Sequence, residues 1–432
     1  MIEVIDYTEG ATPPKLEAIL TRNIGFTPEL EESVDRIVAD VRERGDPALI
    51  EYTQEFDRVS LPAEDLRVPE PDIERALAKA DPDLIQSLEA AASNIRRFHE
   101  AQKRTSWFVE DGDGVILGKR VVPLERVALL VPGASAPLFS TLLMAAIPAQ
   151  IAGVPRICVA TPPGPDGSVH PAVLAAAGLL GLRELYRVFG AQAVAAFAYG
   201  TATLPRVDKL VGPGHPAVQI AKKRVFGDVD IDMIAGPSEI VVVADHTAVP
   251  AYVAADLLSQ AEHGSGFEAA VCITTSRSLA EEVAGELERQ AESLANRDAI
   301  AKALDSYGAV VVVDHLDEAI ELSNRIAPEH LELIVDGPWE QIDAVTNAGA
   351  VFLGPDSPEP VGDYFAGTNH ILPTTGTANF ASSVGVETFI KSMSVVSYTK
   401  RRLSKTSDHI IRLAEAEGLA AHADAIRIRQ ES

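Results

Sequence analysis

The fold is decided by a stretch that opens with RVALLVPG at residues 126–133 and continues through RICVATPP (156–163), ELYRVFG (184–190) and DKLVGPG (208–214). Each run ends near Gly or Pro, and helix-forming sequence lies between the runs. Their apolar character is continuous rather than alternating, which is typical of parallel strands covered on both faces. We therefore predict an α/β module over residues 111–240.

The same rhythm starts again further along the chain, which predicts a second α/β module over residues 241–375. Its apolar runs are EIVVVAD (239–245), EAAVCITT (268–275), GAVVVVD (308–314), HLELIVDG (330–337) and GAVFLG (349–354). Residues 1–110 are expected to form an N-terminal helical region, and residues 376–432 a helical tail for dimerisation. The fold class is thus α/β, with two successive incomplete Rossmann-like modules. The N-terminal helices could pack on either module, which would make a domain discontinuous.

Composition limits the classes of partner. The 432 residues carry 37 Lys and Arg against 63 Asp and Glu, a formal charge of −26. Such an anionic surface repels phosphate backbones and anionic headgroups, so neither nucleic acid nor membrane is an expected partner. The residues MIEVIDYTEG do not show a basic segment followed by an apolar stretch, so a secretory signal is not expected. No apolar run reaches the ~18 residues of a membrane helix. We expect a cytoplasmic protein.

Two short motifs contain polar side chains that could bind a metal or transfer a proton. In LLSQAEHGSG, Gln260 and His263 are three residues apart on a helical pattern, so both project from one face near the helix end. Such a pair is either a helix-terminal hydrogen-bonding arrangement or part of a metal site. In NRIAPEHLELIVD, Glu329 and His330 precede a strand, and an adjacent carboxylate and imidazole suit proton transfer. An exposed pair at a strand entrance is the alternative.

Three further residues extend this set. Asp363 lies in the glycine-bordered loop PVGDYFAGTNH, where short polar side chains commonly build turns. Glu417 and His422 lie on the helical tail, where polar residues ordinarily belong to a solvent-exposed face. Together the clusters offer an amide oxygen, imidazoles and a carboxylate, a mixed set that zinc accepts, although spacing does not show that they converge. The remaining histidines are expected to be surface or structural residues: His99, His170, His246, His315, His370 and His409.

The usual nucleotide signatures are missing from the sequence. There is no G-x-G-x-x-G between a strand and a helix and no Walker A motif. The nearest candidates for a phosphate cradle are the glycine turns at 131–135 and 211–215, where helix amides could favour an anion. Glycine at such strand-to-helix turns is commonly required by the backbone conformation alone, without any bound phosphate.

The sequence resembles the histidinol dehydrogenase family from about residue 25 to the end. The motifs that carry the resemblance occur in the family's order: VPLERV, APLFST, GAQAVAAFAYGT, VDKLVGPG, FGDVDIDMIAGPSEI, DLLSQAEH, NRIAPEHLEL, VGDYFAGTNHILPT and EAEGLAAHA. The resemblance implies a zinc-containing, NAD-dependent enzyme of histidine biosynthesis. Such an enzyme oxidises L-histidinol through an aldehyde to L-histidine, a four-electron change that uses two NAD molecules.

The resemblance also implies roles for individual residues and a homodimer with shared active sites, in which the C-terminal tail completes the neighbour's site. The implied metal ligands are Gln260, His263, Asp363 and His422, and the acid/base pair is Glu329 and His330. The implied substrate contacts are Ser238, Gln260, His263, His330, Asp363, Glu417 and His422. The implied NAD contacts are Leu130, Gln192 and His215.

Two of the NAD positions depart from the family's pattern. Leu130 replaces a tyrosine and His215 replaces an asparagine, whereas Gln192 is kept. Leucine lacks the hydroxyl's hydrogen bond, and imidazole differs in size from an amide. A related zinc-dependent dehydrogenase acting on another small amino alcohol or diol is therefore the alternative function.

Overall fold

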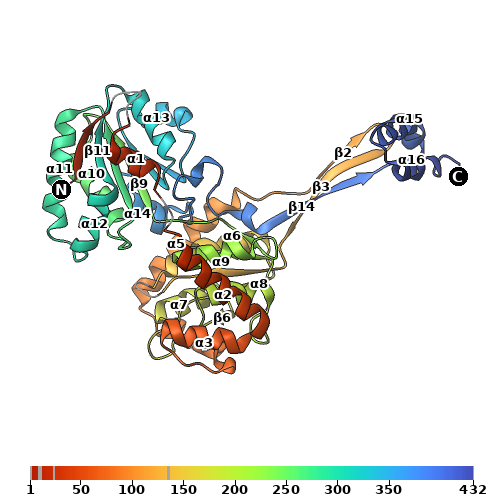
Figure 1. The fold of residues 1–432 in the computed structure, drawn as a ribbon, viewed down its shortest axis with the longest axis horizontal. Helices are drawn as coiled ribbons and strands as arrows, with labels where there is room; N and C mark the ends of the chain where they lie inside the picture. The colour runs from red at the N-terminus through yellow and green to blue at the C-terminus, as the bar shows by residue number, and fades with distance from the viewer. Residues whose placement is uncertain (1, 8–11, 23–24, 134–136, 432) are drawn as a thin grey trace. The chain divides into compact units, whose positions relative to one another are not determined.

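The structure is a computed structural model that describes residues 2–7, 12–22, 25–133 and 137–431. Its contacts divide the chain into two compact units (Figure 1). The first unit contains residues 1–102 and 124–389, and the second contains residues 103–123 and 390–432. Within the described residues, no helix combines the length and apolarity that crossing a bilayer would require.

The first sheet of the first unit is parallel and five-stranded. Its strands, in spatial order, are β6 (Glu184–Tyr186), β5 (Arg156–Ala160), β4 (Arg126–Leu130), β7 (Lys209–Val211) and β8 (Asp230–Ile231). Alternate residues of β4 enter two different cores, with Val127 and Leu129 on one face and Ala128 and Leu130 on the other. Both faces are covered, which explains why these strands are apolar throughout.

Two groups of helices cover the faces of this sheet. One core is closed by α4 (Glu70–Lys79), α5 (Pro82–Glu100), α6 (Phe139–Ala152) and α7 (Pro171–Leu179). The opposite core is closed by α2 (Pro28–Arg44), α3 (Asp46–Asp57), α8 (Ala191–Tyr199) and α9 (Pro216–Val225). The expected N-terminal helices α2 to α5 thus pack on both faces of the first sheet.

The second sheet is parallel and six-stranded. Its strands, in spatial order, are β1 (Glu3–Asp6), β11 (Gly308–Val312), β10 (Ala269–Thr274), β9 (Glu239–Ala244), β12 (His330–Ile334) and β13 (Ala350–Leu353). One face is covered by α10 (Pro250–Ala261), α11 (Arg277–Ala291) and α12 (Arg297–Tyr307). The other face is covered by α1 (Pro14–Leu20) and α13 (Leu316–Ile326), as Figure 1 also shows.

The two sheets share one topology, which confirms the predicted fold class. Numbered within its own module, each sheet runs 3-2-1-4-5, the order of a Rossmann fold that lacks its sixth strand. β1 joins the second sheet from the N-terminal region, where the sequence indicated only helices. A four-residue strand at a sheet edge is too short to give a periodic signal. The boundaries at residues 110, 240 and 375 stay a prediction.

The second unit consists of a three-stranded antiparallel sheet and two helices. The elements are β2 (Trp107–Asp111), β3 (Val115–Pro123), β14 (Ile390–Ser397), α15 (Lys400–Ala416) and α16 (Ala420–Arg427). The tight β2–β3 turn is fixed by the side chain of Asp113, which binds Lys405 at 2.7 Å and Arg401 at 3.0 Å. The helical tail predicted from the sequence is therefore present.

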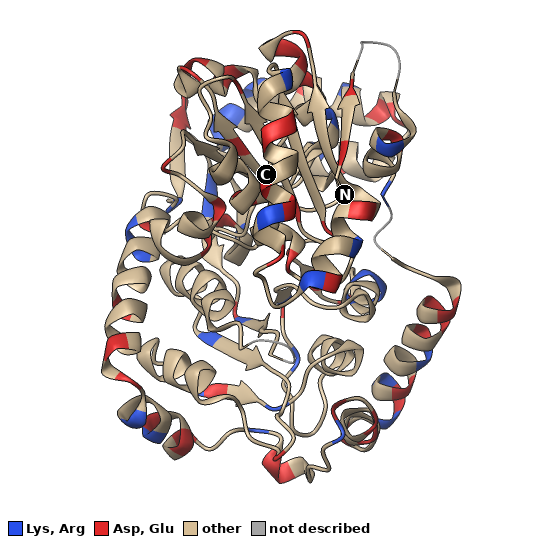
Figure 2. Ribbon diagram, turned by 90° about the vertical axis from the view of Figure 1, so that its left-hand side faces the viewer, with Lys and Arg blue, Asp and Glu red and all other residues tan. Residues whose placement is uncertain are grey.

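Charged residues follow the layers of the fold. Acidic and basic residues are interspersed along the outer helices, whereas the strands carry few of them (Figure 2). The exceptions matter, because buried carboxylates are costly unless something compensates for them. Four carboxyl groups are less than 10% exposed: Glu239 and Glu329 at the start of β9 and β12, Glu332 within β12, and Glu359, whose amide binds Glu332.

Candidate active site

The acid/base pair expected from the sequence lies at the start of β12. The preceding helix α13 ends at Ala327, which takes a left-handed conformation with φ 50°, and Pro328 then turns the chain into the strand. The parallel register pairs His330 with Ile240, so Glu329 lies next to Glu239 on β9. The two side chains of the pair are buried, with Glu329 7% and His330 2% exposed.

The imidazole of His330 is held on one side and open on the other. Its Nδ1 lies 3.1 Å from the carbonyl oxygen of Glu239, which fixes Nδ1 as the donor of that hydrogen bond. Its Nε2 is 3.8 Å from Oδ1 of Asp363 and has no hydrogen-bond partner among the described residues. The nitrogen that faces Asp363 is thus available to accept a proton.

Burial and neighbouring charge shift both groups. Burial raises the pKa of Glu329 to about 7, although the His330 imidazole acts in the opposite direction. Burial alone lowers the pKa of His330, but the carboxylates of Glu329 and Asp363 outweigh it and raise it to about 9. A cation near Asp363 would offset that negative charge and move His330 towards its neutral, proton-accepting form.

Helix α10 brings Gln260 and His263 to the same place. Gln260 is fully buried, yet neither its Oε1 nor its Nε2 has a hydrogen-bond partner among the described residues. A buried amide without partners is costly, so it indicates a missing ligand. His263 follows the end of the helix and is exposed. Neighbouring atoms nevertheless desolvate its ring, which lowers the pKa of His263, while the Asp363 carboxylate acts to raise that pKa. The His263 ring therefore lies within the electrostatic influence of Asp363, and Gln260 is the buried member of the predicted pair.

A short π-helical turn, Gly362–Ala366, presents Asp363. Its carboxylate is 3.8 Å from Nδ1 of His370, and its carbonyl oxygen is 3.1 Å from the same nitrogen. His370, expected to be a surface or structural residue, lies against the turn that presents Asp363. A lone histidine in a glycine-rich loop gives no periodic signal, and only the fold reveals where its ring lies.

Ligand atoms of His330, Glu359 and Asp363 lie within 4.8 Å of one another, which is close enough for one metal ion. Of these three residues, only Asp363 is among the metal ligands that the family resemblance implies. Gln260, an implied ligand whose buried amide has no partner among the described residues, directly follows Ser259, which binds Glu359. Amide, imidazole and carboxylate ligands suit zinc. The residues present therefore fit the metal that the sequence predicts.

A second layer of carboxyl groups lies behind Asp363. Glu332 accepts a hydrogen bond from the amide of Glu359 at 2.7 Å, and burial together with the Asp256 carboxyl raises the pKa of Glu332 to about 9. Burial likewise raises the pKa of Glu359 to about 8, and its Oε2 accepts a hydrogen bond from Ser259 at 3.2 Å. With these raised pKa values Glu332 and Glu359 hold their protons near neutral pH, and a cation bound next to them would favour their ionised forms. The sequence analysis missed Glu332 and Glu359, because nothing in their spacing separates them from ordinary strand and loop carboxylates.

The predicted NAD residues lie at the opposite, carboxyl ends of the strands in the first sheet. β4 and β7 flank the point where the strand order reverses, which is where doubly wound sheets bind ligands. Gly212 has φ 130°, and a Cβ there would overlap the carbonyl oxygen of Leu130. The loop is held by a buried ion pair between Lys222 and Asp232, 2.5 Å long, and both side chains also bind the Gly212 backbone.

The three NAD positions differ in their surroundings. Leu130 is 1% exposed and packs in the core of the first sheet. Gln192 is buried in the first turn of α8, and its Oε1 has no partner within the described part of the chain. His215 is exposed and caps α9 by accepting a hydrogen bond from the amide of Ala217. Their contacts with NAD stay a prediction.

The structure brings Glu329, His330 and Asp363 together, with His263 within the electrostatic influence of Asp363, whereas the convergence of the other predicted residues stays a prediction. Ser238 immediately precedes β9, and its carbonyl accepts a hydrogen bond from the amide of Ala269 at 3.1 Å. Glu417 and His422 belong to the second unit, on the C-terminal helices, and their place in the site stays a prediction.

Comparisons with known proteins agree along the whole chain. A family model described as histidinol dehydrogenase matches residues 20–430. The histidinol dehydrogenase of Heliobacterium mobile is 52% identical over 398 residues, 92% of this chain and 93% of the relative. That of Caldanaerobacter subterraneus is 47% identical over 429 residues, 99% of both chains. A crystal structure of histidinol dehydrogenase from Elizabethkingia anophelis matches with a TM-score of 0.92 and 38% identity, covering 100% of this chain and 99% of that one.

Fold, candidate metal cluster and comparisons together define a zinc- and NAD-dependent oxidoreductase. The chain belongs to the histidinol dehydrogenase family. The resemblance predicted from its motifs is confirmed.

Proposed function

We propose that this protein catalyses the NAD-dependent oxidation of L-histidinol through histidinal to L-histidine. The observation that carries the proposal is the position of the Glu329–His330 pair beside Asp363, supported by the buried and unpartnered amide of Gln260. The acidic surroundings suit a substrate that carries a positive amino group, because opposite charges attract strongly where water is scarce.

Gln260, His263 and Asp363 are the proposed metal ligands, together with His422 of a second copy of the chain. When bound, zinc would act as a Lewis acid that anchors and orients the substrate. Ser238 and Glu417 are proposed substrate contacts, and Leu130, Gln192 and His215 are proposed to face NAD. His330 keeps a role distinct from that of a ligand, because its Nδ1 already binds the Glu239 carbonyl and its Nε2 is needed as a base.

His330 is proposed to act in the first oxidation. Its Nε2 accepts the hydroxyl proton of histidinol while hydride leaves the carbinol carbon for NAD, which gives the aldehyde and one reduced NAD. Glu329 then takes a proton from water, and the water oxygen bonds to the aldehyde carbon. A second hydride leaves this hydrate anion for a second NAD, which gives the carboxylic acid, and the acid releases its proton to solvent to give the carboxylate.

Neither cysteine competes with water as the nucleophile. Cys158 and Cys272 are both fully buried, on β5 and β10. Burial raises the pKa of Cys272 to about 12, and it also raises the pKa of Cys158. Because the thiolate is the reactive form, neither residue suits the formation of a thiohemiacetal.

We also propose that two copies of the chain form a homodimer with shared active sites in the cytoplasm. Every residue of β2 is exposed, and the exposed large apolar residues of the second unit include Trp107, Phe108, Val396 and Leu413. A small sheet with exposed apolar faces needs a partner surface to be stable. A second copy of the same chain supplies it most simply.

The test is to incubate the zinc-loaded protein with histidinol and NAD and to follow reduced nicotinamide at about 340 nm. The proposal predicts rapid formation of two reduced NAD molecules per histidinol. Turnover only with other amino alcohols or diols would support the alternative that the replacements at Leu130 and His215 indicate. Absence of turnover with any alcohol would contradict both.

A further inference from the structure

Glu239 and Glu329 form a reciprocal pair at the amino ends of β9 and β12. The amide of Glu239 donates to Oε2 of Glu329 at 3.1 Å, and the amide of Glu329 donates to Oε2 of Glu239 at 3.2 Å. The carboxylates thus take the place of carbonyl groups at the end of the strand ladder. Any displacement of the Glu239 side chain removes the partner of the Glu329 backbone.

This arrangement places two acidic side chains side by side, and both are nearly inaccessible to water, at 4% and 7% exposure. Such a pair repels and is costly to bury unless a cation lies next to it. That cation is Arg22, whose side chain is 1% exposed and whose Nη2 binds Oε1 of Glu239. Guanidinium stays charged at any ordinary pH, so the compensation is permanent.

Within the described residues, Glu239 is the one carboxylate that Arg22 contacts. Its Nη2 also donates to the carbonyl oxygen of Pro237 at 3.2 Å, next to Ser238, and its guanidinium lies 5.7 Å from the centre of the Tyr307 ring. Its Nε and Nη1 are buried without a hydrogen-bond partner among the described residues. A guanidinium that leaves two nitrogen donors unpaired in the interior is fixed chiefly by its bond to Glu239.

Glu239 reaches both members of the acid/base pair, but in different ways. Its side chain binds the backbone of Glu329, whereas its main-chain carbonyl binds Nδ1 of His330. The carbonyl is fixed by the sheet, while the side chain is held by the backbone of Thr375 and Glu329 and by Arg22, the partner that supplies the compensating positive charge. Loss of Arg22 should therefore disturb Glu329 more than His330.

We propose that Arg22 is a positioning residue that acts through Glu239 to hold Glu329 in place for the hydration of the aldehyde. The inference rests on the proposed function for its chemistry and adds to it a residue outside the predicted site. The inference also assigns a role to the N-terminal segment. Arg22 follows α1 in that segment, and β1 anchors the segment by pairing with β11.

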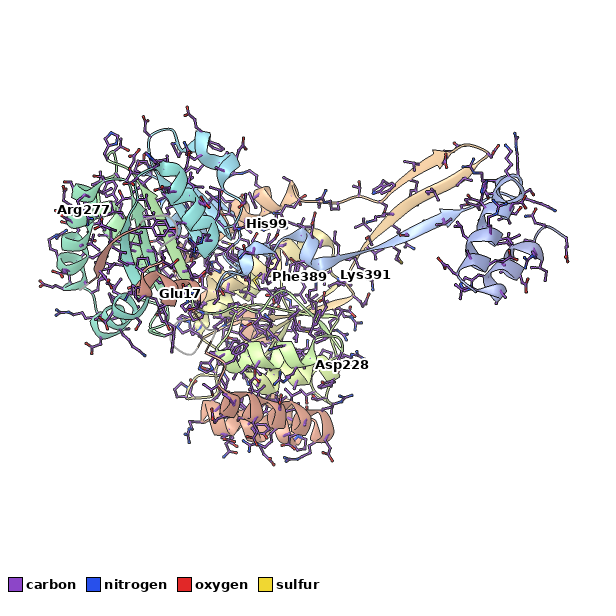
Figure 3. All side chains as sticks on the ribbon, turned by 45° about the horizontal axis from the view of Figure 1, so that its top comes forward. Glu17, His99, Asp228, Arg277, Phe389 and Lys391 are labelled. Atoms are coloured by element: carbon purple, nitrogen blue, oxygen red, sulfur yellow. The ribbon has the colours of Figure 1, made fainter. Side chains whose placement is uncertain are left out.

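The experiment compares wild type, R22M, R22K and R277M with L-histidinol and with L-histidinal supplied directly, each with NAD. R277M is the matched control, because Arg277 pairs with Asp6 of the same N-terminal segment but lies on the outer helix α11 (Figure 3). R22M should lower the rate of histidinal oxidation at least about 10-fold, because catalysis falls steeply when a reacting group is misplaced. Its zinc content should equal that of wild type. Its rate for the first oxidation of histidinol should stay within about 3-fold of the wild-type rate. R22K should restore part of the loss, and R277M should behave as wild type.

Histidinal oxidation by R22M at the wild-type rate would overturn the inference, and so would an equal fall in both steps. If R22M fails to fold, R22M/E239Q removes both charges at once and should fold with the aldehyde step still slow. A wild-type aldehyde step in that double variant would count against the inference. A wild type inactive on histidinol would refute the proposed function instead. A crystal structure of R22M or of the double variant then decides independently, since intact reciprocal bonds to Glu329 in it would overturn the inference.

Discussion

His330 is held in a way that separates orientation from reaction. Its Nδ1 is committed to a backbone carbonyl, and its Nε2 is left without a partner towards Asp363. An asparagine at this position can still donate a hydrogen bond to the carbonyl of Glu239, but it cannot take a proton. Orientation and basicity can therefore be separated by one substitution.

H330N should slow the first oxidation of histidinol by about 10²–10⁴-fold, the usual contribution of a positioned base. Zinc content should stay at the wild-type level, because His330 is not among the proposed ligands. Stopped-flow formation of the first reduced NAD and metal analysis of the same sample measure both effects. An unchanged rate would refute the assignment of His330 as the base.

Asp57 shows a different consequence of burial, far from the chemistry. It is the last residue of α3, where the helix dipole disfavours a negative charge, and its Oδ2 has no partner among the described residues. Burial raises the pKa of Asp57 to about 6. The folded state therefore binds the proton more tightly than the unfolded chain, so the carboxylate destabilises the fold as the pH rises from about 4 through about 6.

D57N should increase the free energy of unfolding by about 1 kcal/mol at about pH 8, after allowance for partial exposure, and by almost nothing at about pH 4. Urea denaturation at the two pH values measures the difference. E55Q, at an exposed position on the same helix, is the control. A gain that is equal at both pH values would contradict the role given to ionisation.

At the scale of elements, the site depends on how closely the start of β12 approaches the segment before β13. The amide of Gly349 donates to the carbonyl of Pro328 at 2.9 Å, and a Cβ on Gly349 would lie 2.6 Å from the carbonyl oxygen of Glu329. Glycine is required there for the close approach rather than for an unusual φ. The position of the catalytic pair therefore depends on a close backbone contact that leaves no space for a side chain at residue 349.

G349A should lower stability by about 1–3 kcal/mol and reduce activity, because the new methyl group pushes Glu329 out of position. G285A offers a control within an element, since Gly285 lies inside α11 and a Cβ there would meet nothing within 4 Å. That change should stabilise the protein by about 0.5–1 kcal/mol and leave activity unchanged. Thermal unfolding and the histidinol assay report on both, and a G349A variant as active as wild type would contradict the tight fit.

The sequence was informative about elements and much less so about convergence. Continuous apolar runs predicted both parallel sheets, because strands covered on both faces leave that pattern. Gln260, His263, Glu329 and Asp363 stood out by residue type and spacing. His370, Glu332 and Glu359 did not, because their importance comes from neighbours distant in the sequence. β1 was likewise hidden, since its pairing with β11 spans some three hundred residues.

At the scale of the whole molecule, the proposed sharing of active sites makes a quantitative prediction. In a dimer formed from H330N and H422N chains, one site would contain both substitutions and the other would contain neither. If the two variants associate at random, about half of all dimers contain one chain of each. Each such mixed dimer has two sites, of which one is intact. The mixture of two inactive variants should therefore recover about a quarter of the wild-type activity.

Chains refolded together, assayed against each variant refolded alone, measure this recovery. The same amount of each variant mixed without refolding is the control. Recovery near zero after refolding, with dimers demonstrably formed, would show that His422 serves the site of its own chain or none.

The most direct test of the account is to locate the metal by anomalous diffraction at the zinc edge, in crystals of the zinc-loaded protein with histidinol. The account predicts one peak per chain, at about 2.0–2.2 Å from Gln260, His263, Asp363 and the His422 of a second copy, with Glu329 and His330 beside it but unligated. A peak bound by His330 and Glu359, or one remote from α10, would contradict the account.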